Sequence, residues 1–460
     1  MDKKPALSKK GLYAYVVGSA IGAGMFVTLP GAIGHTGKSV VLAVLVASIV
    51  YFFGYWYTVA LSAMAPVRGA GYGYISFICP PIMSGIWGIA GLMWIMSNCV
   101  YATGAMEYIS VFIPALKPYI GISAAVLITI FSLIDYVGVG LGAKVEGIMT
   151  VVLTTCVLVF LAIGVTKVDP AAFFRFTAEE PFFANGFIGF SKALGLCIWV
   201  IGGIGGAAIC FAKDVEKPTR TIPFCIVGVT VFITIIGVLI CYVCAGAVPV
   251  NQAIEGVNVV AEAVLPKAFF PVFIIGGAAF ALLSTLQAYI LSYRREILAQ
   301  AEDGFLPSIL TKKTKSGYPI WIGVLLWAAS VIPCLTGFTI DAVASYTGVP
   351  TYLILIYVNI QLFKLPERYP ELWAKSIFRN WPKALWNTVC SFAILCSLYL
   401  VYCYLADFAL KDLLYMAVAV IVMYGWGYYR MKSGKADIKK LEAQKEEVIR
   451  EALEYANQEQ

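Results

Sequence analysis

The sequence predicts an all-α polytopic membrane protein with about 12 transmembrane helices, two of which are broken. Three observations predict this class. The 460 residues are 60% hydrophobic and only 13% charged, apolar segments of spanning length follow one another along the chain, and glycine clusters interrupt two of them. A soluble domain cannot bury so much apolar surface, whereas a membrane protein can expose it to lipid.

The apolar segments recur from residue 11 to residue 430. A helix that crosses a bilayer needs roughly 20 mostly apolar residues. The apolar segments therefore predict one transmembrane domain over 11–430, preceded by an N-terminal segment over 1–10 and followed by a separate tail over 434–460. The first segment is too long for a cleavable signal peptide, and no A-x-A-like site ends it. The segments lie near 11–33, 39–66, 82–113, 121–139, 145–166, 187–211, 222–248, 270–298, 319–336, 340–363, 384–405 and 411–430.

The basic residues predict the orientation in the membrane. Lys3, Lys4, Lys9 and Lys10 precede the first segment, and cytoplasmic loops are enriched in Lys and Arg. If the N-terminus and every second loop are cytoplasmic, 26 of the 33 Lys and Arg lie inside and 7 lie outside. We therefore expect a multi-pass protein of the plasma (inner) membrane with both termini in the cytoplasm. The net charge of +7 is then mostly a topology signal, and no nucleic-acid partner is expected.

Residues that build enzyme and metal sites are scarce. His35 is the one histidine, and the 12 cysteines are scattered through apolar segments. Cys241 and Cys244 form a C-x-x-C inside a predicted span without a partner pair, so small buried hydrophobic residues are the better interpretation. A zinc site or a catalytic triad needs a cluster that is not visible here, and there is no P-loop for ATP. We expect no enzyme and no cofactor other than a coupling ion.

The first glycine cluster interrupts the first predicted span. Gly18, Gly22 and Gly24 make the hydrogen-bond ladder of that helix easy to open. Unwound backbone at membrane depth persists only where protein or a water-lined cavity covers it. The cluster therefore indicates free backbone groups that face a small polar solute. Close packing of helices through small residues is the alternative.

A second cluster interrupts the sixth span, where four glycines, Gly202, Gly203, Gly205 and Gly206, occur within five residues. Spans one and six correspond if the core consists of two inverted five-helix repeats, about 11–166 and 187–363. Paired interruptions at corresponding positions indicate a midplane substrate site in secondary transporters. The helices over 384–430 would then be peripheral.

The tail over 434–460 has a different composition, rich in Ala, Glu and Lys. Its apolar residues have nearly helical spacing, which predicts a short cytoplasmic helix. We expect this helix to be solvated, with the binding of a partner protein as the alternative. The apolar residues are Ile438, Leu441, Val448, Ala452 and Leu453.

Several motifs, in this order, resemble those of the amino acid/polyamine/organocation (APC) superfamily of permeases. Residues 18–26 (GSAIGAGMF) resemble its first-span signature, and 66–74 (PVRGAGYGY) resemble the P-x-x-G-G-x-Y segment after span two. Residues 212–223 (AKDVEKPTRTIP) are similar to the loop after span six, and 302–307 (EDGFLP) belong to a stretch similar to the one after span eight. The resemblance covers about residues 10–430 and is not specific for a substrate.

The resemblance implies the five-plus-five inverted-repeat (LeuT-like) fold and alternating access. The open turn of span one would bind a substrate carboxylate through backbone N–H groups, in agreement with the anion affinity of helix N-termini. The broken part of span six would bind the amino group and frame the side chain, with Trp199 as a lid or, alternatively, as a packing residue. The implied residues are Ala20, Ile21, Gly22, Ala23 and Gly24 in span one, and Trp199, Val200, Gly202 and Gly203 in span six.

Two further positions are implied by alignment with an arginine/agmatine antiporter of the superfamily. Asn98 and Tyr289 fall on its substrate-side asparagine and aromatic residue. A bond between helices is the alternative role for the Asn98 amide, which is costly to leave unpaired in a span. The antiporter's span-six glutamate corresponds to Gly206 here, so cationic substrates lose an obvious partner.

Span eight resembles the sodium site of sodium-coupled members of this fold. The implied ligands are the carbonyls of Gly18, Ile21 and Ala281 and the hydroxyls of Ser284 and Thr285. Bonds from these hydroxyls to their own helix are the alternative. Some sodium-independent members carry a lysine in span five, where this chain has Val157. If protons drive transport instead, Glu107 and Asp135 are candidate carriers.

The sequence thus predicts a secondary active transporter of small to medium neutral amino acids, working by sodium-coupled symport. Proton-coupled symport, amino acid exchange, and transport of an amine or polyamine are the alternatives. The expected partners are an amino acid and the lipid bilayer, and the expected state is a monomer or weak homodimer.

Overall fold

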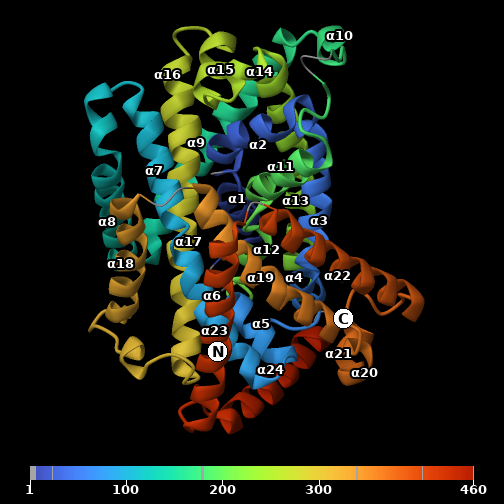
Figure 1. Ribbon diagram of the computed structural model, residues 1–460. Coiled ribbons are helices and arrows are strands. Elements are labelled where there is room, and N and C mark those ends of the chain that lie inside the picture. Colours follow the sequence, from blue (N-terminus) through green and yellow to red (C-terminus); the bar gives the residue numbers. More distant parts are fainter. Residues whose placement is uncertain (1–6, 23, 178–180, 338–339, 407, 459–460) are drawn as a thin grey trace.

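The structure is a computed structural model that describes residues 7–22, 24–177, 181–337, 340–406 and 408–458 (Figure 1). The regular structure of these residues is helical, apart from an isolated bridge between Leu7 and Val215. The first half contains α1 Lys9–Ala20, the π-helix η1 Gly24–Thr28, α2 Leu29–Thr36, η2 Gly37–Ser39, α3 Val40–Gly54, α4 Trp56–Ser62, α5 Ala70–Ile78, α6 Pro81–Ile95, α7 Asn98–Ser110, η3 Pro114–Tyr119, α8 Ile120–Val137, α9 Val139–Gly164, η4 Val165–Lys167 and α10 Pro170–Phe173.

The second half continues the helical bundle. It contains α11 Gly186–Ile201, α12 Ile204–Ile209, α13 Pro218–Gly246, α14 Val250–Ala253, α15 Val257–Val264, α16 Phe270–Val272, the π-helix η5 Phe273–Ala279, α17 Phe280–Glu302, η6 Ser308–Thr311, α18 Ile320–Thr336, α19 Ile340–Leu362, α20 Leu365–Arg368, α21 Pro370–Lys375, α22 Lys383–Leu405, α23 Leu410–Lys432 and α24 Ile438–Gln458.

All 12 predicted spans are helical in the described part of the chain. Nine helical stretches there are long and apolar enough to cross a membrane, and the first of them, Lys9–Gly54, contains predicted span one and the first part of span two, which continues in α4. The remaining two predicted spans correspond to the shorter apolar helix α18 and to α19, which begins beside residues outside the described part. The all-helical membrane architecture is therefore confirmed.

Both glycine clusters end a helix. α1 ends at Ala20, Ile21 has an extended backbone with ψ 94°, and helical structure resumes as a π-helix at Gly24. α11 ends at Ile201, Gly202 is extended with ψ 148°, and α12 begins after Gly203. The backbone of Gly203 is left-handed with φ +88°, a conformation that only glycine adopts without strain. The sequence therefore located both interruptions correctly.

Apolar side chains cover the outside of the bundle. α8 exposes Ile122 and Leu133, α9 exposes Ile148 and Val151, and α23 exposes Ile421 among others. Large exposed apolar surfaces are unfavourable in water but match the acyl chains of a bilayer. α23 contacts α6 and α19, and α22 contacts α3, α11 and α19.

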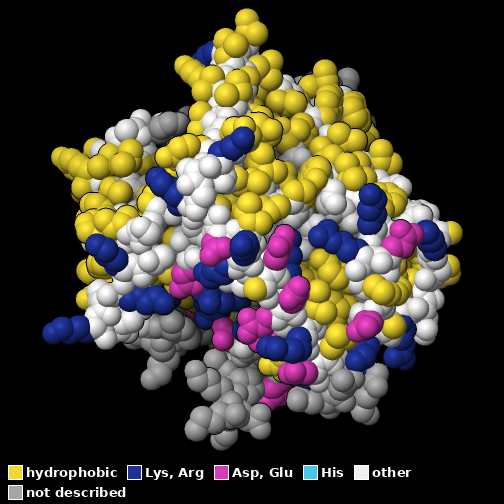
Figure 2. All heavy atoms as spheres, turned by 90° about the horizontal axis from the view of Figure 1, so that it is seen from below, with side chains coloured by type: hydrophobic (Ala, Val, Ile, Leu, Met, Phe, Trp, Pro, Cys, Tyr) yellow, Lys and Arg dark blue, Asp and Glu magenta, His cyan; other side chains and the backbone are white. Residues whose placement is uncertain are grey.

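The two ends of the bundle differ. α10, α14 and α15 lie at one end, and α5, α20, α21 and α24 lie at the other, which we call the α24 end (Figure 1). Charged side chains of both signs gather on the α24 end, whereas hydrophobic side chains dominate the flank above them in the same view (Figure 2). Leu7 donates its backbone N–H to the Asp214 carbonyl at 3.0 Å, so the N-terminal segment lies beside the loop after α12.

The tail helix α24 is docked rather than solvated. Leu441 and Ala452 are buried, and Glu451 forms an ion pair with Lys213 of the loop after α12. Burial lowers the pKa of the Lys445 ammonium, and the charge of Arg368 lowers it further. The apolar spacing of the tail therefore reflects packing against the transporter itself.

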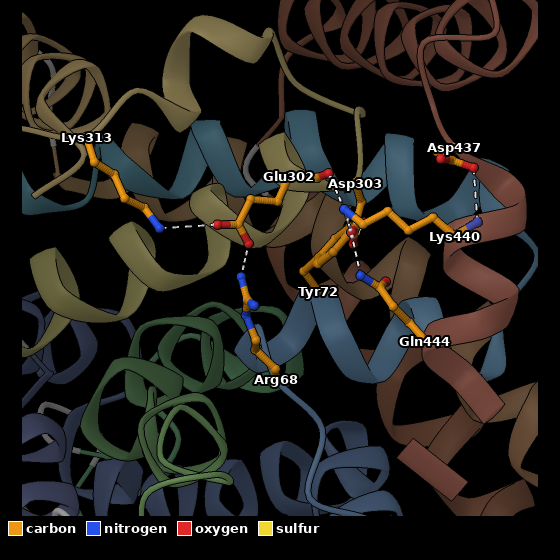
Figure 3. Close-up of polar contacts among 8 residues, drawn as sticks. All are labelled: Arg68, Tyr72, Glu302, Asp303, Lys313, Asp437, Lys440 and Gln444. Atoms are coloured by element: carbon orange, nitrogen blue, oxygen red, sulfur yellow. Dashed lines mark hydrogen bonds and ion pairs between the residues drawn. The ribbon is translucent and has the colours of Figure 1, made fainter. Parts of the chain in front are cut away.

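A charged network joins α24 to the end of α17 (Figure 3). Asp303 accepts hydrogen bonds from the Tyr72 hydroxyl at 2.9 Å and the Gln444 amide at 3.2 Å, and it pairs with Lys440 at 3.5 Å. Glu302 pairs with Arg68. The network thus connects the 66–74 motif, the 302–307 motif and the tail at one end of the bundle.

Candidate functional site

The two interrupted helices meet at Gly24. A Cβ atom built on Gly24 would lie 2.0 Å from the carbonyl carbon of Trp199 and 2.0 Å from the backbone nitrogen of Val200. No side chain fits there, because the obstructing atoms are backbone. Thr28 of η1 also donates to the Leu196 carbonyl of α11 at 3.1 Å. The glycine of the first break is therefore required for the direct contact between the two broken helices.

The second break is positioned by two tyrosines. The Gly203 N–H donates to the Tyr51 hydroxyl oxygen of α3 at 2.9 Å. A Cβ atom on Gly203 would lie 2.3 Å from the Tyr289 hydroxyl of α17. The unwound turn is thus held between α3 and α17, and it exposes backbone next to phenol groups.

An aromatic cavity of about 120 Å³ opens beside this second break. Trp199 lies in its wall, 6.1 Å from Tyr101 and 6.4 Å from Trp94 between ring centroids. Such a cavity suits a small solute with an apolar part, and its ring faces attract an ammonium group. The wall includes Ile198, Gly202, Gly203, Gly206, Ala207, three tryptophans (Trp87, Trp94, Trp199) and eight tyrosines (Tyr51, Tyr55, Tyr57, Tyr101, Tyr289, Tyr293, Tyr352, Tyr404).

One carboxyl group lies in the wall of this cavity. Glu296 of α17 accepts hydrogen bonds at Oε1 from the Tyr72 backbone N–H at 2.8 Å and from the Trp87 indole. It lies two helical turns from Tyr289 along α17. Glu296 was not among the site residues predicted from the sequence.

An oxygen cluster surrounds the first break. The Ser284 hydroxyl of α17 donates toward the Gly18 carbonyl at 3.2 Å. The Thr285 hydroxyl lies 3.0 Å from the Ala281 carbonyl and 3.4 Å from the Ile21 carbonyl. The five groups expected to bind sodium therefore lie together between α1 and α17. The bond from Thr285 to Ala281 is also the within-helix bond that was the alternative.

Glu146 of α9 belongs to the same oxygen cluster, and the sequence analysis missed it. Its Oε1 accepts from the Ser284 hydroxyl at 2.7 Å and lies 3.4 Å from the Thr150 hydroxyl. A Cβ atom on Gly18 would lie 2.2 Å from the Thr150 hydroxyl and 2.7 Å from Glu146 Oε1. The predicted span began at residue 145, whereas α9 begins at Val139, so Glu146 lies two turns inside the helix. The sequence signal for this site is the pair of polar residues Glu146 and Thr150, which lie four residues apart and therefore on the same face of an otherwise apolar helix.

The other predicted site residues lie in three places. Asn98 is buried outside the lining of the aromatic cavity and donates to the Ser330 hydroxyl of α18 at 3.0 Å, the bond between helices that was the alternative. Ala20, Ile21, Gly22 and Gly24 lie at the first break, where a Cβ atom on Gly22 would lie 2.3 Å from the Thr285 hydroxyl. Val200 is buried beside Gly24, and Ala23 lies outside the described residues.

The two carboxyl groups expected as alternative proton carriers, Asp135 and Glu107, lie away from the oxygen cluster that contains Glu146. Asp135 of α8 is paired with Arg294 at 3.2 Å and accepts from the Tyr318 hydroxyl at 2.9 Å. Glu107 is exposed near the end of α7. Neither residue contributes to the oxygen cluster.

Comparison with known proteins identifies the family. A family model described as "Amino acid permease" matches residues 7–424. The chain is similar to the branched-chain amino acid permease BcaP of Bacillus subtilis (22% identity, 77% of this chain and 80% of that one) and to BcaP of Lactococcus lactis (23%, 79% and 82%). It is also similar to the vacuolar cationic amino acid transporter 2 of Arabidopsis thaliana (25%, 80% and 62%). The chain therefore belongs to the amino acid permease family, as the resemblance to APC permeases implied.

Proposed function

We propose that this permease carries small to medium neutral amino acids across the plasma membrane by alternating access, in symport with a cation. One observation supports this above all others. Two interrupted helices touch at Gly24, and the second of them lines an aromatic cavity. Interrupted helices that meet in a bundle provide backbone dipoles for a zwitterion without a buried side-chain charge.

The composition of the cavity favours a neutral substrate. Its wall is mainly aromatic rings and glycine backbone, so an apolar substrate side chain gains dispersion contacts there and is shielded from water. The substrate amino group can lie against ring faces and the carbonyls near Gly202. Two of the similar proteins are named as branched-chain amino acid permeases, which agrees with such a substrate.

The cation is proposed to bind in the oxygen cluster between α1 and α17. Sodium is the ion that the sequence predicts, and its ligands would be the oxygens of Gly18, Ile21, Ala281, Ser284 and Thr285, which lie together. Glu146 supports the alternative ion, a proton, because its carboxyl group hydrogen-bonds the same Ser284 hydroxyl.

Cationic amino acids or amines are a second candidate substrate class. Glu296 places a carboxyl group in the aromatic wall, and aromatic faces together with a carboxylate recognise ammonium groups. Two similar proteins of Arabidopsis thaliana are named as cationic amino acid transporters. Uptake of L-lysine that exceeds uptake of L-isoleucine would select this class.

The orientation is proposed from the shared location of several segments. The N-terminal residues, the loop after α12, the end of α17 and α24 all lie at the α24 end. All of them were assigned to the cytoplasm by the distribution of Lys and Arg, so we place the α24 end in the cytoplasm.

A binding screen of the twenty amino acids, with sodium and with choline in its place, tests the proposal. The purified full chain should gain thermal stability with a subset of neutral amino acids, because a ligand that binds only the folded state stabilises it. No stabilisation by any amino acid, and no uptake in proteoliposomes under any ion gradient, would contradict transport of amino acids.

A further inference from the structure

The carboxyl group of Glu146 has an unusual environment. It lies on α9, only 2% of the residue is exposed, and its Oε2 atom is buried without a hydrogen-bond partner among the described residues. Its Oε1 accepts from Ser284 at 2.7 Å. A buried carboxylate with one unpartnered oxygen is costly, and such a group becomes stable when it binds a proton or a cation.

No basic side chain neutralises Glu146 in the described part of the chain. The titratable group that faces it from α1 is the Tyr15 phenol, which donates to the Ala288 carbonyl at 3.0 Å. α17 contributes hydroxyl groups, and its two arginines are paired elsewhere, Arg294 with Asp135 of α8 and Arg295 with Asp214. The other elements packed against α9 place no charge beside it. η5 has no charged residue, Arg220 of α13 and Glu262 of α15 are exposed, and Lys167 at the end of η4 lies about six turns along the chain.

Hydrogen bonds already join the oxygens of the cluster. The Ser284 hydroxyl lies between the Gly18 carbonyl at 3.2 Å and Glu146 Oε1 at 2.7 Å, and the Thr285 hydroxyl lies 3.0 Å from the Ala281 carbonyl. These contacts have the lengths of hydrogen bonds between oxygens. The hydroxyls serve as donors in these bonds, whereas Glu146 Oε2 is the carboxyl oxygen of the cluster that has no donor, so it is free to accept a proton.

The cluster also lies directly against α1, one of the two interrupted helices. Gly18 packs directly against Thr150 and Glu146, so any shift of α1 changes the surroundings of the carboxyl group. Gly18 lies at the end of α1 that leads into the first break, six residues before the Gly24 contact with α11. Movement of α1 can thus open the carboxyl group to water on one side of the membrane.

We propose that Glu146 binds the coupling proton of this permease, so that the oxygen cluster is a proton site. The inference rests on the proposed transport function and deepens it. An O–H bond forms at Oε2 with a proton from the water that reaches the cluster in one state. The same bond breaks in the other state, and the proton passes to water on the opposite side. No other reactant is needed.

The experiment uses the full chain in proteoliposomes, with L-isoleucine as the probe, or L-lysine if the binding screen selects it. In sodium-free medium, an inward proton gradient should drive accumulation by the wild type, and a pH-sensitive dye should report protons entering with the amino acid. Glu146→Gln, which mimics the protonated state, should lose accumulation and proton entry but retain exchange of labelled for unlabelled amino acid. Retained exchange shows that this variant is folded.

Glu107→Gln is the matched control, because it removes a carboxyl group from a span without touching the cluster. It should accumulate substrate as the wild type does. Accumulation that follows a sodium gradient and ignores the proton gradient would overturn the proton site, and so would proton entry that persists in Glu146→Gln.

A spectroscopic measurement needs neither transport nor a folded glutamine variant. The infrared spectrum of the wild type should contain a protonated-carboxyl band that disappears at alkaline pH and shifts in Glu146→Asp. If the band is unchanged in Glu146→Asp, the proton resides elsewhere and the inference is wrong. If instead the band behaves as expected while neither accumulation nor exchange of any amino acid occurs, the proposed function fails and the proton site stands.

Discussion

The two interruptions of this bundle are built from the same residue type but have different surroundings. The break after α1 faces hydroxyls, carbonyls and the Glu146 carboxyl group, and the described residues there leave little free space. The break after α11 faces aromatic rings and an open cavity. We propose that the two breaks have different roles, in which the first binds the coupling ion and the second binds the substrate. Their contact at Gly24 would then couple the two sites mechanically.

The largest effect is expected where the two breaks touch. Gly24→Ala would force a methyl group to within 2.0 Å of backbone atoms of Trp199 and Val200, which cannot rotate away. Overpacking typically costs about 1–3 kcal/mol, and we expect a loss at or above the top of that range, with most transport lost. The midpoint of thermal unfolding and the yield of monodisperse protein measure it.

Gly147→Ala is the control for Gly24→Ala. Gly147 also lies in a membrane helix, but a Cβ atom there would meet no atom within 4 Å. It should leave folding and uptake unchanged. Equal behaviour of the two variants would contradict the direct contact between the breaks.

A large effect on coupling is expected at the first break. Ser284→Ala removes the hydroxyl that donates to Glu146 Oε1, and a buried acceptor that loses its donor costs about 1–3 kcal/mol. Gradient-driven accumulation should fall steeply, while the concentration for half-maximal exchange changes little. Ser48→Ala is the control, since the Ser48 hydroxyl bonds only within its own helix, at 2.7 Å from the Val44 carbonyl. If Ser284→Ala kept full accumulation, the coupling role of the cluster would be excluded.

A moderate effect on affinity is expected at the second break. Tyr51→Phe removes the acceptor of the Gly203 N–H and should loosen the unwound turn. The loss of one hydrogen bond is worth about 1 kcal/mol, which corresponds to roughly a fivefold rise in KM at unchanged coupling. Tyr74→Phe, which loses a bond to the Ala65 carbonyl away from the cavity, is the control. A KM that stays constant in Tyr51→Phe would show that this turn does not support the substrate.

The smallest effect is expected from Gly206→Ala. A Cβ atom at Gly206 would meet no atom within 4 Å, and the residue lies in the cavity wall. Alanine favours helix over glycine by roughly 0.5–1 kcal/mol, so stability should rise slightly. The added methyl narrows the cavity, so competition assays should show weaker inhibition by the bulkiest amino acids alone. If inhibition by small and by bulky amino acids weakened equally, Gly206 would have a role other than limiting the size of the cavity.

The sequence was sufficient for most of the fold because spanning segments and glycine interruptions leave strong local signals. Apolar length located the spans, and glycine density located both breaks to within a residue or two. The docking of α24 depends on contacts with α21, with Asp303 at the end of α17 and with Lys213 after α12, and no local pattern encodes these contacts. For that reason the tail was expected to be solvated.

The site was predictable only in part. The resemblance to known permeases identified the break residues and the hydroxyls of Ser284 and Thr285. These hydroxyls contact Gly18 and Ile21, which belong to the first-span motif. The resemblance did not identify Glu146, because the start of α9 lies before the apolar segment that marks it. The tyrosines of the cavity come from six helices and the turn between α3 and α4, so only the tertiary structure shows that they share one wall.

The ratio of cations to amino acid transported per cycle tests the different roles of the two breaks most directly, measured in the wild type, Ser284→Ala and Tyr51→Phe. The ratio should fall toward zero in Ser284→Ala and stay at the wild-type value in Tyr51→Phe, which loses only affinity. A ratio that falls in Tyr51→Phe and survives in Ser284→Ala would contradict the assignment of the ion to the first break and the substrate to the second.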